Sequence, residues 1–194
     1  TTADSHRRTI LVEVMGNKAG WLTLHAGIAA GADVILIPEI PFDIDAVCEA
    51  VANTYERGKR SCVVAVAEGA VLASEAPFKK RERVFIRPDR GEVTVTPHLA
   101  EVIGERTGAE TRATVLGYIQ RGGAPSAYDR VLSTRLGRYA AFLANEGRFG
   151  VTAAVAGSEI TFNALPDIAG RYKLVDPGCE LVRTAEDIGI GLGR

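Results

Sequence analysis

Hydrophobic residues gather in four short runs along this chain, and each run is apolar almost throughout rather than at alternate positions. The runs are Ile10–Met15, Asp33–Pro38, Ser61–Ala67 and Thr114–Gly117. Strands buried on both faces of a parallel sheet have this pattern, whereas strands with one face in water alternate. The sequence therefore predicts an α/β fold with a parallel sheet of at least these four strands.

Helical spacing fills the gaps between the runs. Asp43 is placed to cap a helix that Gly58 ends, and Thr96-Pro97 begins another that stops before Gly108. The apolar positions of these two helices are Ile44, Val47, Cys48, Val51 and Tyr55, and then Leu99, Val102 and Ile103. Right-handed crossovers place such helices on both faces of the sheet, which predicts three layers.

A third, longer helix is predicted from about Pro125 to Asn145, with an apolar stripe on one face. The stripe consists of Tyr128, Leu132, Leu136, Tyr139 and Leu143. Val84–Ile86 and Val93–Val95 flank turn residues and favour a surface hairpin. The basic run Lys79–Arg83 before it could attract an anion, but a solvated loop of mixed charge explains it better, and no role is assigned to it.

Composition narrows the class of protein. The 194 residues are 46% hydrophobic and 24% charged, with a net charge of −1, so one soluble globular unit is expected, without nucleic-acid or membrane partners. No apolar run reaches the length of a membrane span and no secretory signal is visible, which makes the cytoplasm the expected location. The three cysteines and three histidines are scattered, so they predict no disulfide framework and no metal site.

Polar residues and glycines follow three of the predicted strands at the point where each strand ends. Met15-Gly16-Asn17 follows the first strand, Glu68 the third and Tyr118–Gly123 the last. Ligands of parallel sheets bind beyond the carboxyl ends of the strands. The sequence therefore predicts one cleft formed by these three loops.

Four motifs give the chain a family resemblance. They read ETRATVLGYIQRGG at 110–123, SHRRTILVEVMG at 5–16 followed by AGW at 19–21, and AEG at 67–69, with DRVL at 129–132 after them. Their sequences and order resemble the 6-phosphofructokinase family, strongly from residue 1 to about 150 and more weakly through Asp176. The chain starts with Thr1 rather than with methionine, at what would be an internal motif of the family, so we expect it to be the C-terminal part of a longer protein.

The resemblance implies roles for the arginines. It assigns Arg121 to the 6-phosphate of the sugar within its own subunit, and Arg8 with Arg112 to the site of a neighbouring subunit, so a dimer or tetramer with shared sites is implied. A guanidinium group suits phosphate because it offers paired hydrogen bonds and stays charged. Without the motifs, each arginine would more simply be a surface residue.

The same resemblance places Met15, Gly16 and Glu68 against the sugar. From its position alone, Glu68 could equally cap the following helix. The glycines of the segment 16–20 suggest a helix opening whose N–H groups favour an anion, although such spacing is a weak signal.

Two residues depart from the family pattern. Asn17 stands where the family usually has arginine, and Tyr118 stands where it usually has histidine. Two neutral groups thus replace potentially cationic ones at the phosphate, so either the substrate differs, or the activity is reduced, or Lys18 compensates. Losing charge-assisted hydrogen bonds worth roughly 1.5 to 3 kcal/mol would weaken binding by about tenfold or more apiece.

Regulation has a less specific signal. The segment Gly58-Lys59-Arg60 resembles the effector-binding loop of regulated family members, with Asp33 where they commonly have glutamate. A helix C-terminus with solvated cations explains Lys59 and Arg60 as well.

The function implied by the resemblance is transfer of a phosphoryl group from ATP or diphosphate to the 1-hydroxyl of fructose 6-phosphate, with Mg²⁺ as cofactor. Residues 1–122 would form the sugar-phosphate-binding domain, and residues 123–194 the return helix and C-terminal segment of a nucleotide-binding domain absent from this chain. The catalytic base and donor site would lie outside the chain, so no catalytic residue is assigned. A non-catalytic paralogue that binds a sugar phosphate is the alternative, and a generic sugar-binding α/β module would explain the fold but not the ordered motifs.

Overall fold

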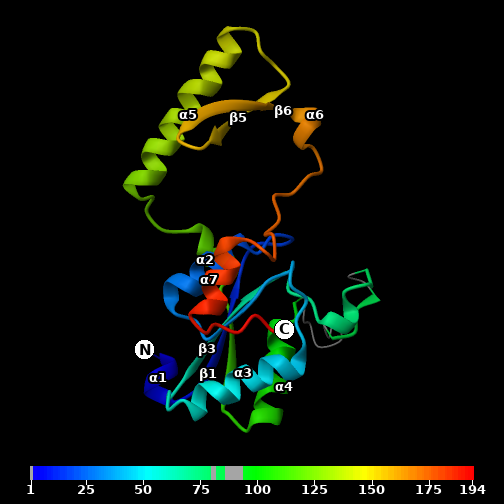
Figure 1. Cartoon of the computed structure of the whole chain (residues 1–194). Coiled ribbons are helices and arrows are strands. Elements are labelled where there is room, and N and C mark those ends of the chain that lie inside the picture. Colours follow the sequence, from blue (N-terminus) through cyan, green and yellow to red (C-terminus); the bar gives the residue numbers. More distant parts are fainter. Residues whose placement is uncertain (1, 80–81, 86–93) are drawn as a thin grey trace. The chain divides into compact units, whose positions relative to one another are not determined.

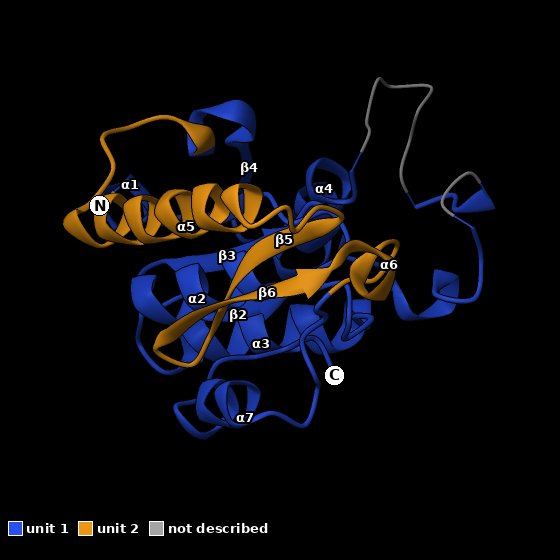
Figure 2. Cartoon of the chain, turned by 90° about the horizontal axis from the view of Figure 1, so that it is seen from above, with its two compact units in different colours: residues 1–120, 173–194 blue, residues 121–172 orange. Residues whose placement is uncertain are grey.

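The computed structural model describes residues 2–79, 82–85 and 94–194, and the chain divides into two compact units (Figures 1 and 2). Unit 1 comprises residues 1–120 and 173–194, and unit 2 comprises residues 121–172. The chain therefore leaves unit 1, builds unit 2, and returns to unit 1 at Lys173.

Unit 1 is built on a parallel sheet of four strands. They are β1 (Thr9–Val14), β2 (Val34–Leu36), β3 (Cys62–Ala67) and β4 (Thr111–Val115), in the order β2-β3-β1-β4. This confirms the predicted parallel α/β sheet. β4 begins three residues before the predicted run, so Leu116 and Gly117 lie in the loop after it.

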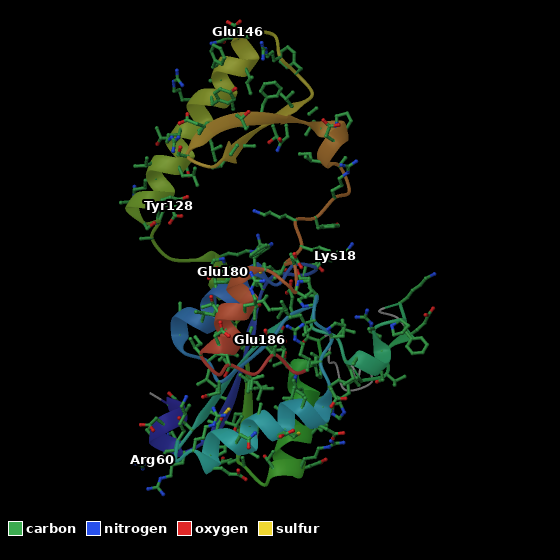
Figure 3. All side chains as sticks on the ribbon, viewed as in Figure 1. Lys18, Arg60, Tyr128, Glu146, Glu180 and Glu186 are labelled. Carbon is green, nitrogen blue, oxygen red and sulfur yellow. The ribbon has the colours of Figure 1, made fainter. Side chains whose placement is uncertain are left out.

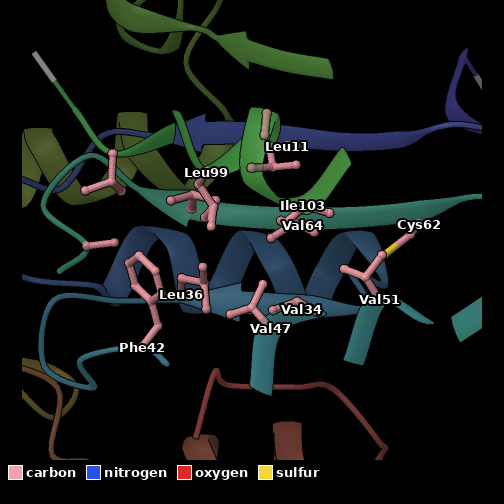
Figure 4. Packing of buried hydrophobic residues seen from close by; sticks show 14 residues of the cluster. Leu11, Val34, Leu36, Phe42, Val47, Val51, Cys62, Val64, Leu99 and Ile103 are labelled. Atoms are coloured by element: carbon pink, nitrogen blue, oxygen red, sulfur yellow. The ribbon is translucent and has the colours of Figure 1, made fainter. Parts of the chain in front are cut away.

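Alternate residues of the inner strands enter two different hydrophobic cores. Val34 and Leu36 of β2 pack with residues of α3 (Ile44–Glu56) and α4 (Thr96–Thr107), and Figure 4 shows this cluster. Ile35 packs on the opposite face with residues of α2 (Trp21–Ala30) and α7 (Glu180–Asp187). Burial on both faces is the reason that the strand is apolar at every position.

The predicted helix signals hold in this unit. Asp43 is the N-cap of α3, where its Oδ1 accepts hydrogen bonds from the N–H groups of Asp45 at 2.7 Å and Ala46 at 3.1 Å. Gly108 ends α4 with a left-handed φ of 70°, a conformation that glycine adopts without steric cost. The chain enters β1 from a short helix, α1 (Thr2–His6).

β4 was predicted to be buried on both faces, and this is wrong. It is an edge strand of the described sheet, and residues 112–115 are exposed, with 53% of Val115 accessible to solvent. An apolar run therefore does not by itself predict burial: β2 also stands at the end of the strand order, yet Val34, Ile35 and Leu36 are buried.

The C-terminal residues also differ from the expectation that residues 123–194 form one segment. Residues 173–194 belong to unit 1, where Val182, Ala185 and Ile190 are buried in the same cluster as Ile35. Gly191 extends the sheet beyond β2, because its N–H donates to Asp33 O and its carbonyl accepts from Ile35 N–H, at 2.9 and 2.8 Å. The apolar face of α7 thus finds its partner in unit 1.

Unit 2 contains the predicted long helix, α5 (Ala127–Asn145), and an antiparallel hairpin of β5 (Val151–Ala156) and β6 (Glu159–Ala164), followed by α6 (Leu165–Ile168). A capping box starts α5: Asp129 N–H donates to Ser126 Oγ, and Ser126 N–H donates to Asp129 Oδ2. Hydrogen bonds from Ser126 lower the pKa of the Asp129 carboxyl. Along the predicted stripe Leu143 is buried within this unit, whereas 72% of Tyr128 is exposed.

The predicted hairpin before α4 is not formed by its described residues. Val84 and Phe85 lie in a bend, as do Thr94 and Val95, and the remaining positions, 86–93, lie outside the described residues. The buried Glu75 explains the first bend, because its Oε1 accepts the N–H groups of Val84 at 2.7 Å and Phe85 at 2.8 Å. Those groups are therefore satisfied by a side chain rather than by a strand partner.

Candidate functional site

Three loops meet at the carboxyl edge of the sheet. In the strand register Val14 of β1 lies beside Ala67 of β3, and Glu13 lies beside Val115 of β4. The segments that follow these strands, 15–17, 68–69 and 116–121, therefore start side by side. This is the edge where the sequence predicted a cleft.

Glu68 holds the loop that follows β1. Its Oε1 accepts hydrogen bonds from the N–H groups of Asn17 at 2.6 Å and Gly16 at 3.3 Å. Neither backbone group has a partner in a strand, so the carboxylate supplies one. Of the two positional explanations, capping of the next helix is wrong, because Glu68 binds the neighbouring loop instead.

The same loop has two tight backbone features. Asn17 has a left-handed φ of 47°, which asparagine tolerates better than most residues. A Cβ atom on Gly69 would lie 1.7 Å from the carbonyl oxygen of Asn17, so the loops after β1 and β3 approach each other too closely for any side chain there.

Gln120 holds the loop from the other side, and the sequence analysis missed it. Its Oε1 accepts the Met15 N–H at 3.0 Å, and its Nε2 donates to Gly117 O at 3.3 Å. The available signal was its position in the loop after β4, but a neutral amide between Ile119 and Arg121 does not by itself indicate a role.

The start of α2 is not an open anion site. The helix begins at Trp21 rather than at Gly16, so the predicted helix opening across 16–20 is wrong. The Gly20 N–H donates to the carboxylate of Glu39, at 3.0 Å to Oε1 and 3.1 Å to Oε2. Glu39 Oε1 also accepts the Val175 N–H at 2.8 Å, which ties the returning chain to unit 1.

Tyr118 and Arg121 lie in the short 3-10 helix Gly117–Arg121 that follows β4. Both side chains are exposed, and 85% of Tyr118 is accessible to solvent. Arg121 is thus adjacent in sequence to Gln120, whose side chain anchors this turn to Met15.

Arg8 and Arg112 lie at the other edge of the sheet. Arg8 precedes β1, and Arg112 is the second residue of β4, in register with Ile10. Both donate to Glu110 Oε1, at 2.7 Å from Arg8 Nη2 and 3.1 Å from Arg112 Nη2. The hydrogen bond from Arg8 lowers the pKa of the Glu110 carboxyl. Arg8 and Arg112 thus share the carboxylate of Glu110 at the amino edge, away from Glu68 at the carboxyl edge.

The candidate regulatory residues lie at this amino edge too. Lys59 Nζ donates to Asp33 Oδ1 at 2.6 Å, and Val63 N–H donates to Asp33 Oδ2 at 2.9 Å. Arg60 is exposed, and Figure 3 shows it at the end of unit 1 opposite Lys18. Asp33 therefore joins the end of α3 to the start of β2 and β3.

No group of three or more His, Cys, Asp or Glu in residues 2–79, 82–85 and 94–194 could hold a metal ion. Burial raises the pKa of the Cys62 thiol to about 12, which keeps it neutral. No helix within the described ranges has the length and apolarity needed to cross a bilayer.

Glu68 and Gln120 cross-link the strand-end loops of a parallel α/β sheet at its carboxyl edge, which is the edge where ligands of such sheets bind. The family model described as Phosphofructokinase matches residues 1–144. The chain belongs to the phosphofructokinase family.

Individual relatives agree with this. The ATP-dependent 6-phosphofructokinase of Spirochaeta thermophila is 45% identical over all of this chain and 53% of its own length. The pyrophosphate–fructose 6-phosphate 1-phosphotransferase of Streptomyces coelicolor is 42% identical over all of this chain and 55% of its own length. The chain thus spans about half the length of these curated relatives.

The solved structure of phosphofructokinase from Saccharomyces cerevisiae matches with a TM-score of 0.71 and 39% identity, over 86% of this chain and 21% of that one. A pyrophosphate-dependent phosphofructokinase from Marinobacter aquaeolei matches 96% of this chain with a TM-score of 0.72. At 24% identity, the latter supports the fold alone.

Proposed function

We propose that this chain is the sugar-phosphate half of an enzyme that transfers a phosphoryl group to the 1-hydroxyl of fructose 6-phosphate, a reaction of glycolysis. The main observation in its support is that Glu68, the loop 15–17 and the loop 116–121 meet at one edge of the sheet in a chain of the phosphofructokinase family. The donor is ATP or diphosphate, since similar relatives are named for each.

The proposed site assigns binding roles to this chain's own residues. Arg121 would neutralise the 6-phosphate, and Glu68, with Oε1 committed to the loop, would offer its other oxygen to a sugar hydroxyl. The backbone of Met15, Gly16 and Asn17 would border the sugar. Mg²⁺, which would neutralise charge on the transferring phosphoryl group, is proposed to be held with the donor by residues outside this chain, as is the base that accepts the hydroxyl proton.

We further propose that two subunits share each site. Arg8 and Arg112 lie at the amino edge and Glu68 at the carboxyl edge of the same sheet, which supports a role for the arginines in a neighbouring subunit's cleft. The oligomer would be a dimer or tetramer in the cytoplasm. Regulation by an anion at Asp33, Lys59 and Arg60 stays a prediction, in which an effector would compete with Asp33 for Lys59.

The test of this function is an assay of the full-length protein with fructose 6-phosphate, Mg²⁺ and either ATP or diphosphate. We expect fructose 1,6-bisphosphate to form with one of the two donors. Binding of fructose 6-phosphate without turnover by either donor would instead favour the non-catalytic paralogue, and no binding of any sugar phosphate would contradict the site.

Asn17 and Tyr118 depart from the family pattern, so replacing them tests whether they weaken the binding of fructose 6-phosphate or adapt the site to another ligand. If they only weaken it, Tyr118→His in the full-length protein should tighten fructose 6-phosphate binding by about tenfold, because a cationic donor replaces a phenol. Asn17→Arg should gain less, since arginine in the left-handed conformation of residue 17 costs roughly 1–2 kcal/mol.

Calorimetric titration of the parent, both single variants and the double variant against a panel of sugar phosphates measures this. Replacing Tyr118 should not disturb packing, because 85% of this residue is accessible to solvent. Weaker binding of fructose 6-phosphate by Tyr118→His, together with a loss of affinity for another sugar phosphate, would show that the cleft is tuned for that other ligand.

A further inference from the structure

The loop after β1 is held at three successive backbone groups by side chains from both neighbouring strands. Glu68, after β3, accepts the N–H groups of Gly16 and Asn17, and Gln120, after β4, accepts the N–H of Met15. The two acceptors stand on different segments of the chain. Glu68 stands on a segment that the proposed sugar site already includes, whereas Gln120 stands on the turn that carries Arg121.

Gln120 also fixes its own turn. Its Nε2 donates to Gly117 O, at the first residue of the 3-10 helix, while its Oε1 reaches across to β1. Gly117 has a left-handed φ of 54°, so the turn bends sharply where this bond closes it. One amide therefore sets the shape of the turn and its position relative to Met15.

The environment of Gln120 favours this geometry. The side chain borders a cavity of about 320 Å³ formed by residues of β1, β3 and α2 together with Leu116, and this lining is almost wholly apolar. A half-buried amide at such a wall depends on its polar partners, since a lost partner leaves a donor or acceptor unsatisfied. The two bonds thus restrict Gln120 to the bridging position.

We infer that Gln120 is a positioning residue for sugar-phosphate binding: it holds residues 117–120, the turn that leads into Arg121, against the sugar loop 15–17. This inference rests on the proposed function, because it assigns Gln120 a role at that same site. Gln120 acts through its neighbours and is given no contact with the substrate.

The test is a double-mutant cycle in the full-length protein. Gln120→Met keeps the approximate length of the side chain and removes both hydrogen bonds. We expect it to raise the Michaelis constant for fructose 6-phosphate about threefold to tenfold, with little change in the constant for the donor. In an Arg121→Ala background the same substitution should have almost no further effect, because the group that it positions is gone.

Hydrogen exchange gives a readout independent of activity. The Met15 N–H should exchange faster in Gln120→Met than in the parent, while the N–H groups of β3 keep their protection. A matched control is Thr107→Val, which also removes two hydrogen bonds, the one from Thr107 Oγ1 to Ile103 O and the one from Ala109 N–H to Thr107 Oγ1, and should leave the sugar-phosphate constant unchanged.

The outcomes distinguish a failure of the proposed function from a failure of the positioning role of Gln120. A parent protein that binds no sugar phosphate contradicts the proposed function. A parent that binds it normally, with Gln120→Met leaving both the Michaelis constant and Met15 exchange unaltered, overturns the positioning role. Equal effects of Gln120→Met with and without Arg121 also overturn it, because the residue would then act by general stability.

Discussion

Replacing Arg121 with alanine in the full-length protein should raise the Michaelis constant for fructose 6-phosphate by about tenfold to a hundredfold. A hydrogen bond between charged groups contributes roughly 1.5 to 3 kcal/mol, and its loss appears in substrate binding if Arg121 holds the 6-phosphate. The constant for the phosphoryl donor should barely move. Steady-state kinetics with each substrate varied in turn measures both values.

Arg112→Ala should have an effect of the same size, but for a different structural reason. Arg112 shares Glu110 with Arg8 at the amino edge of the sheet, so it would act in a neighbour's cleft. Mixing Arg112→Ala subunits with Glu68→Gln subunits should then regenerate some intact sites. The exposed Arg138 on α5 offers a matched control, since Arg138→Ala removes the same charge elsewhere. Mixed oligomers that form without recovering activity would contradict a shared cleft.

Gly69→Ala should lower both the stability of unit 1 and the affinity for the sugar phosphate. The new methyl group would lie 1.7 Å from the carbonyl oxygen of Asn17, and that atom belongs to the backbone, so the loop 15–17 has to move. Forcing extra volume into a packed site costs about 1–3 kcal/mol. Thermal unfolding and calorimetric titration of the full-length protein measure the two losses.

Gly137→Ala is the control for this substitution. Gly137 lies inside α5, and a Cβ atom there meets nothing within 4 Å in the described structure. Alanine should therefore stabilise the helix by roughly 0.5–1 kcal/mol through backbone entropy. If Gly69→Ala lowers neither the melting temperature nor the affinity for the sugar phosphate, the close approach of the two loops contributes to neither stability nor binding.

The sheet and its helices could be predicted because local signals agree with the fold. Apolar runs identify β1, β2 and β3, and Asp43 and Gly108 mark helix ends in the sequence as they do in the structure. The exposure of β4 could not be predicted, because burial depends on which elements cover the two faces of a strand, and no local pattern encodes that. The packing of residues 173–194 with unit 1 could not be predicted for a similar reason, since the partners of Val182 and Ala185, such as Ile35, are far away in the sequence.

The position of the candidate site could be predicted from the sequence, but the hydrogen bonds that hold its loops together could not. Strand ends led to Met15, Glu68 and the loop with Arg121, and the register places those segments side by side. The sequence did not indicate that one carboxylate oxygen of Glu68 would accept hydrogen bonds from backbone N–H groups. It also did not indicate that Gln120 and Glu39 would accept such bonds. Such side-chain-to-backbone bonds depend on how two loops approach each other, which residue type alone does not specify.

The position of Gly191 beside β2 has a consequence for how the protein is made. Residues 182–192 supply one side of a core that also contains Leu24 and Ile35, yet they leave the ribosome only after all of unit 2 has been synthesised. Until then the nascent chain carries an uncovered apolar surface on β2 and α2. Such long-range closure slows folding and exposes intermediates to aggregation, so chaperone binding during translation should concentrate on the stage before residues 182–192 emerge.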